Sequence, residues 1–301
     1  MIIRGQHGIR SYPLINLAGA KTGDPRPTSM NPSTDTAIKY AELRKDQLDV
    51  CWQWLSSGLD WGPDDVVLDI GCGTGAYSKL LLDRGHIKSI TGYDKSKEFI
   101  DVARQVNFEE GKTIYEVADA TDAATLKPEW KSAFTKAMSI AMFQFIDDKK
   151  AFFKNACWCL KPGGYFLMNF HHGNVMGTLE TMRQYMSDHP KWKPLTKDYT
   201  YDVYAACLFR GTREQLEQLA IECGFSEAHI EERFCYYYGN CSEDDFKSFI
   251  DIQFEQIQHI PADRKKEFID DAYQKLVEIN ERDEQDRLCI KCPTWILTAK
   301  K

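Results

Sequence analysis

Residues 69–75 place one acidic side chain before three glycines at alternate positions. They read Asp-Ile-Gly-Cys-Gly-Thr-Gly and continue an apolar run that begins at Val66. A short apolar run of this kind is typical of a buried strand. Glycines directly after a strand allow a tight turn and let a ligand approach the backbone closely. We therefore predict a strand followed by a ligand-binding loop; the alternative at this point is a purely structural glycine turn.

The spacing of the glycines excludes two common phosphate-binding loops. Gly71, Gly73 and Gly75 form Gly-x-Gly-x-Gly, whereas the dinucleotide fingerprint is Gly-x-Gly-x-x-Gly. A P-loop ends in Gly-Lys followed by Ser or Thr, but Gly75 is followed by Ala76. The loop therefore belongs to neither class.

Two further acidic side chains follow short apolar runs. The run at 89–94 ends in Asp94, which lies 19 residues after Gly75, and the run at 113–120 contains Asp119 near its end. Doubly wound nucleotide-binding folds place a ribose-binding carboxylate at about this distance after the glycine loop. A carboxylate there can accept hydrogen bonds from both ribose hydroxyls. Acids at three successive strand ends, with the glycine loop first, favour a ligand-binding edge of a sheet over isolated helix caps.

Strand and helix patterns alternate from Met30 onward, which predicts parallel βαβ units and an α/β fold. Further strands are expected at 137–142 and after the turn Leu160-Lys-Pro-Gly-Gly164, and the last two at 230–238 and 294–301. Helices are expected where apolar residues recur at i, i+3, i+4 and i+7. These positions are Phe99, Val102, Ala103 and Val106; Phe153, Ala156, Cys157 and Leu160; and Leu216, Leu219, Ala220 and Cys223.

Signals for helix starts and ends allow helices to be predicted in the C-terminal third of the chain. Thr212 and Gln215 have the spacing of a capping box. Residues 242–282 are expected to form two helices, with Ser242 as a cap and Pro261 at a helix start. We interpret 173–211 and 242–282 as insertions on the acceptor side of the domain. Residues 1–29 show no periodicity and are expected to be a disordered leader, with a faint transit-peptide character as the alternative.

Composition narrows the class of partner. The chain has 301 residues and a net charge of −7, so it lacks the basic balance of a nucleic-acid or anionic-membrane binder. No apolar stretch approaches the roughly 18 residues of a membrane helix. The ten cysteines are scattered. Cys289 and Cys292 form the one Cys-x-x-Cys; a zinc site would also need Cys235 and Cys241, and we expect no metal.

The glycine loop and the acids together resemble motif I and the following strand ends of the class I S-adenosylmethionine-dependent methyltransferases. This resemblance implies a Rossmann-like, seven-stranded, mostly parallel sheet with helices on both faces. In this fold the final strand inserts antiparallel between its neighbours, so the helices of 242–282 become an excursion between the last two strands. The resemblance implies S-adenosylmethionine as cofactor. The implied cofactor-binding residues are Asp69, Gly71, Cys72, Gly73, Asp94, Asp119, Ala120 and Ile140.

From about Met30 to Lys301 the chain resembles one family more closely, the juvenile hormone acid methyltransferases of insects and their invertebrate relatives. That family methylates the carboxylate of a farnesoid acid, which implies a small lipophilic carboxylic acid as acceptor. The matching segments are Met30-Asn31, Arg44 with Asp46, the motif at 69–75, Gly92-Tyr-Asp94, Ile260-Pro-Ala-Asp263, Phe268-Ile-Asp-Asp271 and the final Ala-Lys-Lys.

The chain departs from this family where the acceptor carboxylate is bound. Leu43 stands where the family has a Gln, and Phe143-Gln144-Phe145 stands where it has Leu-His-Trp. A buried carboxylate without donors is costly, so other donors must replace them or the acceptor differs. The implied substrate-binding residues are Leu43, Phe143, Gln144 and Phe145.

The same departure leaves the chemistry of the acceptor open. A carboxylate is already ionised at pH 7 and needs no base, whereas a phenol, a thiol or a protonated amine must first lose a proton. Gln144 and His171 are the candidate catalytic residues, His171 because it directly follows the expected fifth strand, at its C-terminal end. Phe145 could also contact a cationic amine. A non-enzymatic binder is disfavoured by the intact acids. We expect a cytoplasmic monomer or homodimer with a small-molecule substrate and no nucleic-acid or membrane partner.

Overall fold

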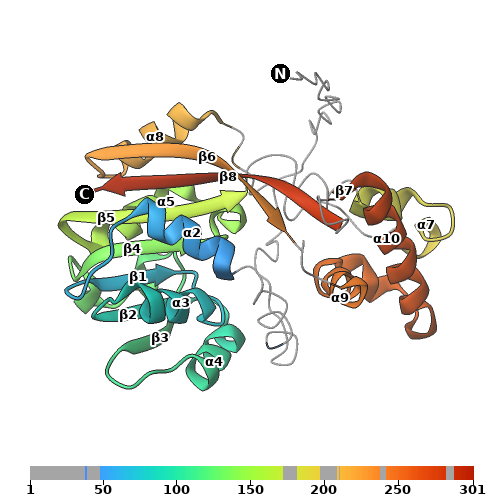
Figure 1. Ribbon diagram of the computed structural model, residues 1–301, viewed down its shortest axis with the longest axis horizontal. Helices are drawn as coiled ribbons and strands as arrows, with labels where there is room; N and C mark the ends of the chain where they lie inside the picture. Colours follow the sequence, from blue (N-terminus) through green and yellow to red (C-terminus); the bar gives the residue numbers. More distant parts are fainter. Residues whose placement is uncertain are drawn as a thin grey trace, which may run out of the picture.

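The computed structural model describes residues 38, 48–171, 182–196, 209, 211–237, 242–282 and 288–301. These residues are arranged around one mixed sheet whose main strand order is β3-β2-β1-β4-β5-β8-β6 (Figure 1). The predicted leader at 1–29, Leu43 and most of the predicted insertion at 173–211 lie outside the described residues.

Five parallel strands form the larger part of the sheet. In the register of this part, Asp69 lies beside Gly92, and Gly92 lies beside Tyr115. Because the strands are parallel, their carboxyl ends meet at one edge of the sheet. The five strands are β1 (Val66–Ile70), β2 (Ser89–Asp94), β3 (Thr113–Val117), β4 (Phe134–Ile140) and β5 (Leu160–His171).

The last long strand inserts antiparallel, as predicted. β8 (Leu288–Lys300) pairs antiparallel with β5 on one side and with β6 (Glu227–Tyr237) on the other. β8 begins before the predicted 294–301 because its first half pairs with the outer part of β6. An eighth strand, β7 (Glu281–Arg282), was not predicted; it has two residues and pairs with the start of β8. Two residues are too few to show a periodicity.

Helices cover both faces of the sheet. On one face, α2 (Leu48–Gly58) and α3 (Ala76–Gly85) share a core with β1, β4 and β5. On the other face, α5 (Lys149–Cys159) and α8 (Arg213–Glu222) pack on the opposite sides of the same strands. A third, small cluster joins α4 (Lys97–Val106) to Cys72 and Tyr115.

Three residues of the predicted helical faces differ from the prediction. Cys223 is buried but follows α8 as its C-cap, because the helix ends at Glu222. Val106 is the last residue of α4 and is 55% exposed, because the helix ends there and its final side chain is not covered. Leu160 is fully buried but starts β5, because its extended backbone ends the preceding helix at Cys159. The other predicted positions of α4 and α5 are buried.

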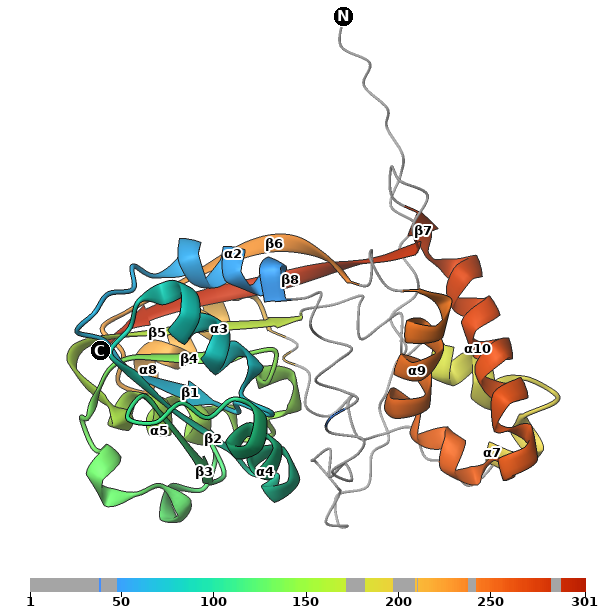
Figure 2. The same ribbon diagram turned by 60° about the horizontal axis from the view of Figure 1, so that its bottom comes forward.

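The helical excursion between the last long strands is confirmed. It contains α9 (Glu243–Gln253), the 3₁₀ turns η5 (Glu255–His259) and η6 (Ala262–Arg264), and α10 (Lys265–Ile279). Figures 1 and 2 show α9 and α10 at one end of the molecule beside α7 (Lys193–Thr196), with the sheet at the other end. Among the described residues, no helix combines the length and apolarity needed to cross a membrane.

The capping box of α8 provides a test of the fold. Thr212 accepts a hydrogen bond from the Gln215 backbone N–H, and the Gln215 side chain accepts one from the Thr212 N–H. Thr212→Ala is expected to lower the free energy of unfolding by about 1 kcal/mol, because one helix N–H loses its acceptor. Urea unfolding measures this loss. Arg213→Ala, at the next exposed position, is the matched control; equal losses in the two variants would contradict the cap.

Candidate cofactor and acceptor site

The glycine loop after β1 is held by the backbone of β2. The N–H groups of Gly71 and Cys72 both donate to the carbonyl of Tyr93, at 2.8 and 2.9 Å. Gly71, Gly73 and Gly75 have φ angles of 72°, 55° and 78°, which is the left-handed region that favours glycine. The loop then turns directly into α3, whose first residue is Ala76.

The three glycines meet different surroundings. A Cβ at Gly71 would lie 2.4 Å from Cγ of Met142, and one at Gly75 would lie 2.7 Å from the Tyr115 hydroxyl. A Cβ at Gly73 would meet nothing within 4 Å. Gly71 and Gly75 therefore permit close packing of the protein on itself, whereas Gly73 leaves space beside the loop.

Asp94 joins the end of β2 to the glycine loop. Its carboxylate accepts hydrogen bonds from the backbone N–H of Gly73 at 3.0 Å and of Ser96 at 2.9 Å, one on each oxygen. Burial raises the pKa of Asp94 above its usual value, although these two donors act in the opposite direction. Since each carboxylate oxygen has two lone pairs, both oxygens retain acceptor capacity for a diol.

Asp119 is oriented by the turn that follows β3. Its Oδ1 accepts from the backbone N–H of Thr121 at 2.8 Å and from the Thr121 hydroxyl at 2.7 Å. The Asp119 N–H donates to the Thr125 hydroxyl at 2.9 Å. These bonds fix the carboxylate and leave its second oxygen as an acceptor.

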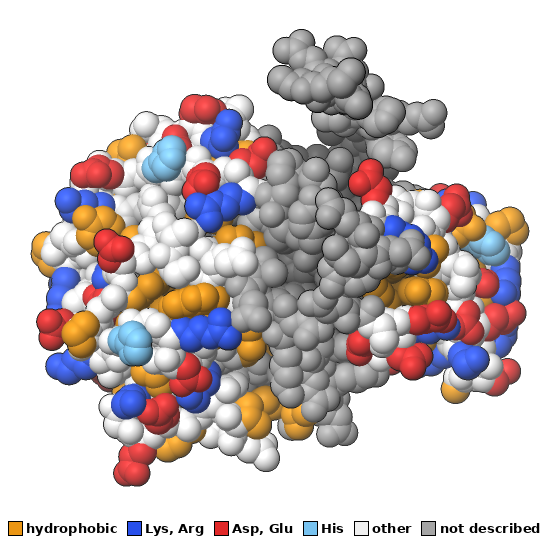
Figure 3. Space-filling view, viewed as in Figure 1, with side chains coloured by type: hydrophobic (Ala, Val, Ile, Leu, Met, Phe, Trp, Pro, Cys, Tyr) orange, Lys and Arg blue, Asp and Glu red, His pale blue; other side chains and the backbone are white. Residues whose placement is uncertain are grey.

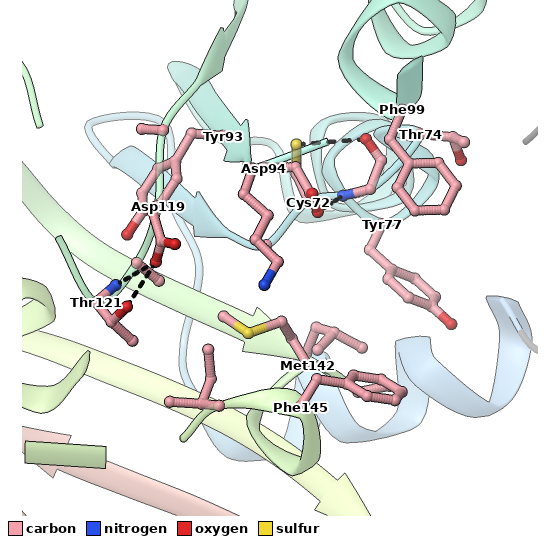
Figure 4. A pocket seen from close by; sticks show the side chains of 18 of the residues that line it. Cys72, Thr74, Tyr77, Tyr93, Asp94, Phe99, Asp119, Thr121, Met142 and Phe145 are labelled. Atoms are coloured by element: carbon pink, nitrogen blue, oxygen red, sulfur yellow. Dashed lines mark hydrogen bonds between the residues drawn. The ribbon is translucent and has the colours of Figure 1, made fainter. Parts of the chain in front are cut away.

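One cavity of about 200 Å³ connects these elements. Figure 4 shows Asp94, Cys72 and Thr74 on one side of it and Met142 with Phe145 on the other. It is lined by Gly71, Cys72, Gly73, Thr74, Ala76, Tyr77, Tyr93, Asp94, Lys95, Phe99, Ala118, Asp119, Ala120, Thr121, Ile140, Ala141, Met142, Phe145, Ile146 and Asp147.

Seven of the eight predicted cofactor residues line this cavity, and Asp69 does not. Asp69 is 1% exposed and accepts a hydrogen bond from the Ser78 hydroxyl of α3 at 2.5 Å. Its carboxylate therefore joins β1 to α3 beneath the loop. Burial, with the charge of Asp94 as a lesser cause, raises the pKa of Asp69 to about 7, although the Ser78 hydrogen bond acts in the opposite direction.

The predicted acceptor residues separate into different environments. Phe145 lines the cavity. Phe143 is fully buried instead, with its ring centroid 4.8 Å from that of Phe170 and 5.4 Å from that of Phe152. Gln144 is buried outside the cavity lining, and its Nε2 donates to the Ala141 carbonyl at 2.7 Å. Leu43 and the His171 side chain lie outside the described residues, so their roles remain predictions.

The sequence reasoning missed several residues of the lining. Lys95 directly follows Asp94, and Tyr77 lies two residues after Gly75, so their positions after predicted strand ends were an available signal. Met142 and Ile146 flank the predicted acceptor triplet, and Asp147 follows Ile146. The distinction between Phe143 and Phe145 has no sequence signal, because both are aromatic residues in one short turn.

The lining fits S-adenosylmethionine. The carboxylates of Asp94 and Asp119 are placed to accept from ribose hydroxyls and from an amino group, and the space at Gly73 lets a ligand approach the backbone. The N-terminus of α3, with Ala76 and Tyr77 on the cavity, favours a carboxylate.

Asp69 predicts a pH dependence of stability. Its pKa is higher in the folded chain than in the unfolded one, so the folded state binds more protons between about pH 4 and 7 and loses stability as the pH rises through that window. Asp69→Asn removes this loss and keeps an acceptor for Ser78. Relative to wild type, the variant should gain stability from pH 4 to 8, on the order of 4 kcal/mol at most.

Denaturant unfolding of the ligand-free chain at several pH values measures this difference. Asp64→Asn, at an exposed position before β1, controls for the general loss of one negative charge. A stability difference between Asp69→Asn and wild type that does not change with pH would contradict the raised pKa.

Gly71 predicts a defect in cofactor binding. In Gly71→Ala the new Cβ would both strain a left-handed backbone and overlap Met142, so the loop must shift. We expect a stability loss of at least about 1–2 kcal/mol and a clear loss of S-adenosylhomocysteine affinity, measured by calorimetry. Gly111→Ala is the matched control, because Gly111 has φ +73° and no atom within 4 Å of the added Cβ. Unchanged affinity in Gly71→Ala would show that this packing is not needed.

Comparisons with known proteins agree with this geometry. Residues 68–168 match the family model described as a methyltransferase domain. The chain is 24% identical over 249 residues to juvenile hormone acid O-methyltransferase of Drosophila melanogaster, covering 80% of this chain and 78% of the relative. It is 32% identical over 113 residues to the ubiquinone biosynthesis O-methyltransferase of Idiomarina loihiensis, covering 38% of this chain and 45% of that protein. The chain thus matches about half the length of relatives of this second kind.

Solved structures show the same fold. Phosphoethanolamine N-methyltransferase 2 of Haemonchus contortus, in complex with S-adenosyl-L-methionine, is similar with a TM-score of 0.56 at 16% identity, covering 91% of this chain and 59% of that one. A putative sarcosine dimethylglycine methyltransferase from Galdieria sulphuraria has a TM-score of 0.51 at 14% identity, covering 89% and 98%. The chain therefore has the class I S-adenosylmethionine-dependent methyltransferase fold, with a methyltransferase domain over residues 68–168.

Proposed function

We propose that the chain is an S-adenosylmethionine-dependent O-methyltransferase whose acceptor is a small, lipophilic carboxylic acid. The observation that carries this proposal is the single cavity that joins the glycine loop, Asp94 and Asp119 to the apolar side chains of Met142 and Phe145. The proposed acceptor class is supported by the similarity to a juvenile hormone acid O-methyltransferase over most of both chains.

The work of the protein in this reaction is binding and orientation. S-Adenosylmethionine, when bound, supplies a methyl group on a positively charged sulfur. Asp94 and Asp119 would fix the nucleoside, and the glycine loop would hold the amino-acid part. Met142, Phe145 and Ile146 would present the acceptor in line and limit the access of water. A carboxylate acceptor is ionised at pH 7, so no general base is required.

A second candidate is an amine, phenol or thiol acceptor. It is favoured by the charges of the described lining, which include three carboxylates and one ammonium. These belong to Asp94, Asp119, Asp147 and Lys95. Phe145, standing where the related family has Trp, adds an aromatic face that can contact a cation. Such an acceptor must lose a proton, and His171 at the end of β5 is the candidate base.

We further propose that the chain acts in the cytoplasm, as a monomer or homodimer, without a nucleic-acid partner. The net charge of −7 supports the absence of a nucleic-acid partner. On the face in Figure 3, Lys and Arg side chains are interspersed with Asp and Glu rather than gathered into a stripe.

The assay is methyl transfer from methyl-labelled S-adenosylmethionine to a panel of fatty and farnesoid acids, amines, phenols and thiols. We expect label in a product that mild base hydrolyses, because a carboxyl methyl ester is base-labile. Label appearing in an amine, ether or thioether alone would overturn the acid acceptor and support the second candidate.

Two variants test whether the turnover uses this cavity. Asp94→Ala removes the carboxylate that accepts from the Gly73 N–H and is proposed to bind the ribose. Turnover should therefore fall at least about a hundredfold, as for the loss of a key positioning contact. Asp101→Ala, on the exposed side of α4, should leave turnover unchanged. No transfer to any acceptor by wild type, despite cofactor binding, would point to a non-enzymatic binder.

A further inference from the structure

The turn after β4 contains a strained residue on the cavity. Ala141 has φ +54° and is not a glycine, so its Cβ makes this left-handed conformation unfavourable. It lines the cavity between Ile140 and Met142. Residues held in such conformations persist where the surrounding structure enforces them, and they cluster at functional sites.

Two buried amide side chains hold the backbone of Ala141. Its N–H donates to Oδ1 of Asn169 at 2.9 Å, and also to the Asn169 carbonyl at 3.1 Å. Its carbonyl accepts from Nε2 of Gln144 at 2.7 Å. Asn169 is 1% exposed and Gln144 is 5% exposed, so neither bond competes with bulk water. Both polar groups of Ala141 are therefore fixed by side chains from two other elements, β5 and the 3₁₀ turn η4 (Phe143–Phe145).

The two hydrogen bonds to Ala141 leave one buried polar atom of each amide without a partner among the described residues. The Ala141 N–H requires an oxygen from Asn169, and the Ala141 carbonyl requires a nitrogen from Gln144, so the orientation of each amide is determined. The remaining atoms, Nδ2 of Asn169 and Oε1 of Gln144, are buried with no hydrogen-bond partner among the described residues. Unsatisfied buried polar atoms are unfavourable. Apolar side chains would avoid this cost, so the two amides are better explained by what they do for Ala141.

The backbone conformation of Ala141 determines the position of the next residue, Met142, which packs on the glycine loop. Met142 packs so closely on Gly71 that a Cβ there would lie 2.4 Å from its Cγ. In Figure 4, Met142 and Phe145 lie across the cavity from Asp94 and Cys72. The backbone at Ala141 thus sets where this second wall of the cavity stands relative to the loop.

We propose that Asn169 and Gln144 are positioning residues that hold Ala141 in its left-handed conformation and thereby place Met142 against the glycine loop for cofactor binding. This inference rests on the proposed use of the cavity for S-adenosylmethionine. It gives Gln144 a role through Ala141 in place of direct contact with the acceptor, and it adds Asn169, which the sequence did not single out.

The experiment measures the affinity of the full-length variants for S-adenosylhomocysteine by calorimetry, beside their stability in urea. Asn169→Leu and Gln144→Leu should each bind at least about tenfold more weakly, as expected for one lost buried hydrogen bond expressed in binding. A carboxyl buried as deeply as Asn169 is kept neutral by its raised pKa at mildly acidic pH, so Asn169→Asp, assayed there beside wild type, keeps an acceptor oxygen for the Ala141 N–H and should restore most of the affinity. No affinity loss in either Leu variant, or a loss in Asn169→Asp equal to that in Asn169→Leu, would overturn the inference.

Gln256→Leu is the matched control. Gln256 is fully buried, donates from Nε2 to the Arg183 carbonyl at 2.7 Å, and also leaves its Oε1 buried without a partner among the described residues. It differs from Gln144 in its acceptor: Gln144 donates to Ala141, which lines the cavity, whereas Arg183 is not among the lining residues. Its loss should lower stability without changing affinity for S-adenosylhomocysteine. Equal affinity losses in Gln256→Leu and Gln144→Leu would mean that the effect is general destabilisation.

A second background keeps the test decisive if a Leu variant folds poorly. Ala141→Gly adopts φ +54° with little strain, so it depends less on the amides. The loss caused by Gln144→Leu should be smaller in Ala141→Gly than in wild type; equal losses would overturn the positioning role. Because the readout is binding, failure of wild type to bind S-adenosylhomocysteine would instead overturn the proposed function.

Discussion

The hydrogen bond from the Gly73 N–H to the Asp94 carboxylate is the interaction on which the site depends. It ties the loop after β1 to the end of β2, and it requires the parallel register that places Asp69 beside Gly92. That register also explains why β2 carries a glycine: a Cβ at Gly92 would lie 2.9 Å from Cβ of Cys72. A change in the pairing of two strands would therefore separate the acid from the loop.

The two walls of the cavity are stabilised by different means. The loop wall uses the sheet itself, since the Tyr93 carbonyl and the Asp94 carboxylate both belong to β2 or its end. The opposite wall follows β4, where Ala141 leaves the sheet in a strained conformation. Its N–H keeps one backbone bond to the Asn169 carbonyl, and the side-chain amides of Asn169 and Gln144 add one further bond each. Because two side chains hold the wall after β4, a few substitutions there can change its position. This wall lies on the side proposed for the acceptor, and acceptors differ between the relatives.

Local patterns predicted most of the fold, and most of the residues assigned from them to the cofactor line one cavity. Strand-ending acids and glycines are signals carried by neighbouring residues, and all but Asp69 of the residues assigned from them line the cavity. Asp69 lies outside the lining because its carboxylate reaches Ser78 on α3, a contact that a sequence does not show. Phe143 and Phe145 were not distinguished because a 3₁₀ turn has about three residues per turn, so aromatics two positions apart point in different directions. One packs on Phe170, and the other faces the cavity.

The charged side chains of the cavity lining act differently on the two classes of acceptor. Asp94 and Asp119 each accept backbone N–H hydrogen bonds, so much of their charge is already compensated within the protein. Asp147 also lines the cavity, and a carboxylate acceptor beside it would meet like charge. Among the described lining residues Lys95 can offset this repulsion, and so can the positive sulfur of S-adenosylmethionine when it is bound. An amine acceptor would reverse the balance, because it must be deprotonated to react and three nearby carboxylates favour its protonated form. The acidic lining therefore aids the binding of a protonated amine but opposes the proton loss that its methylation requires. For a carboxylate the lining opposes binding, but the reaction requires no proton loss.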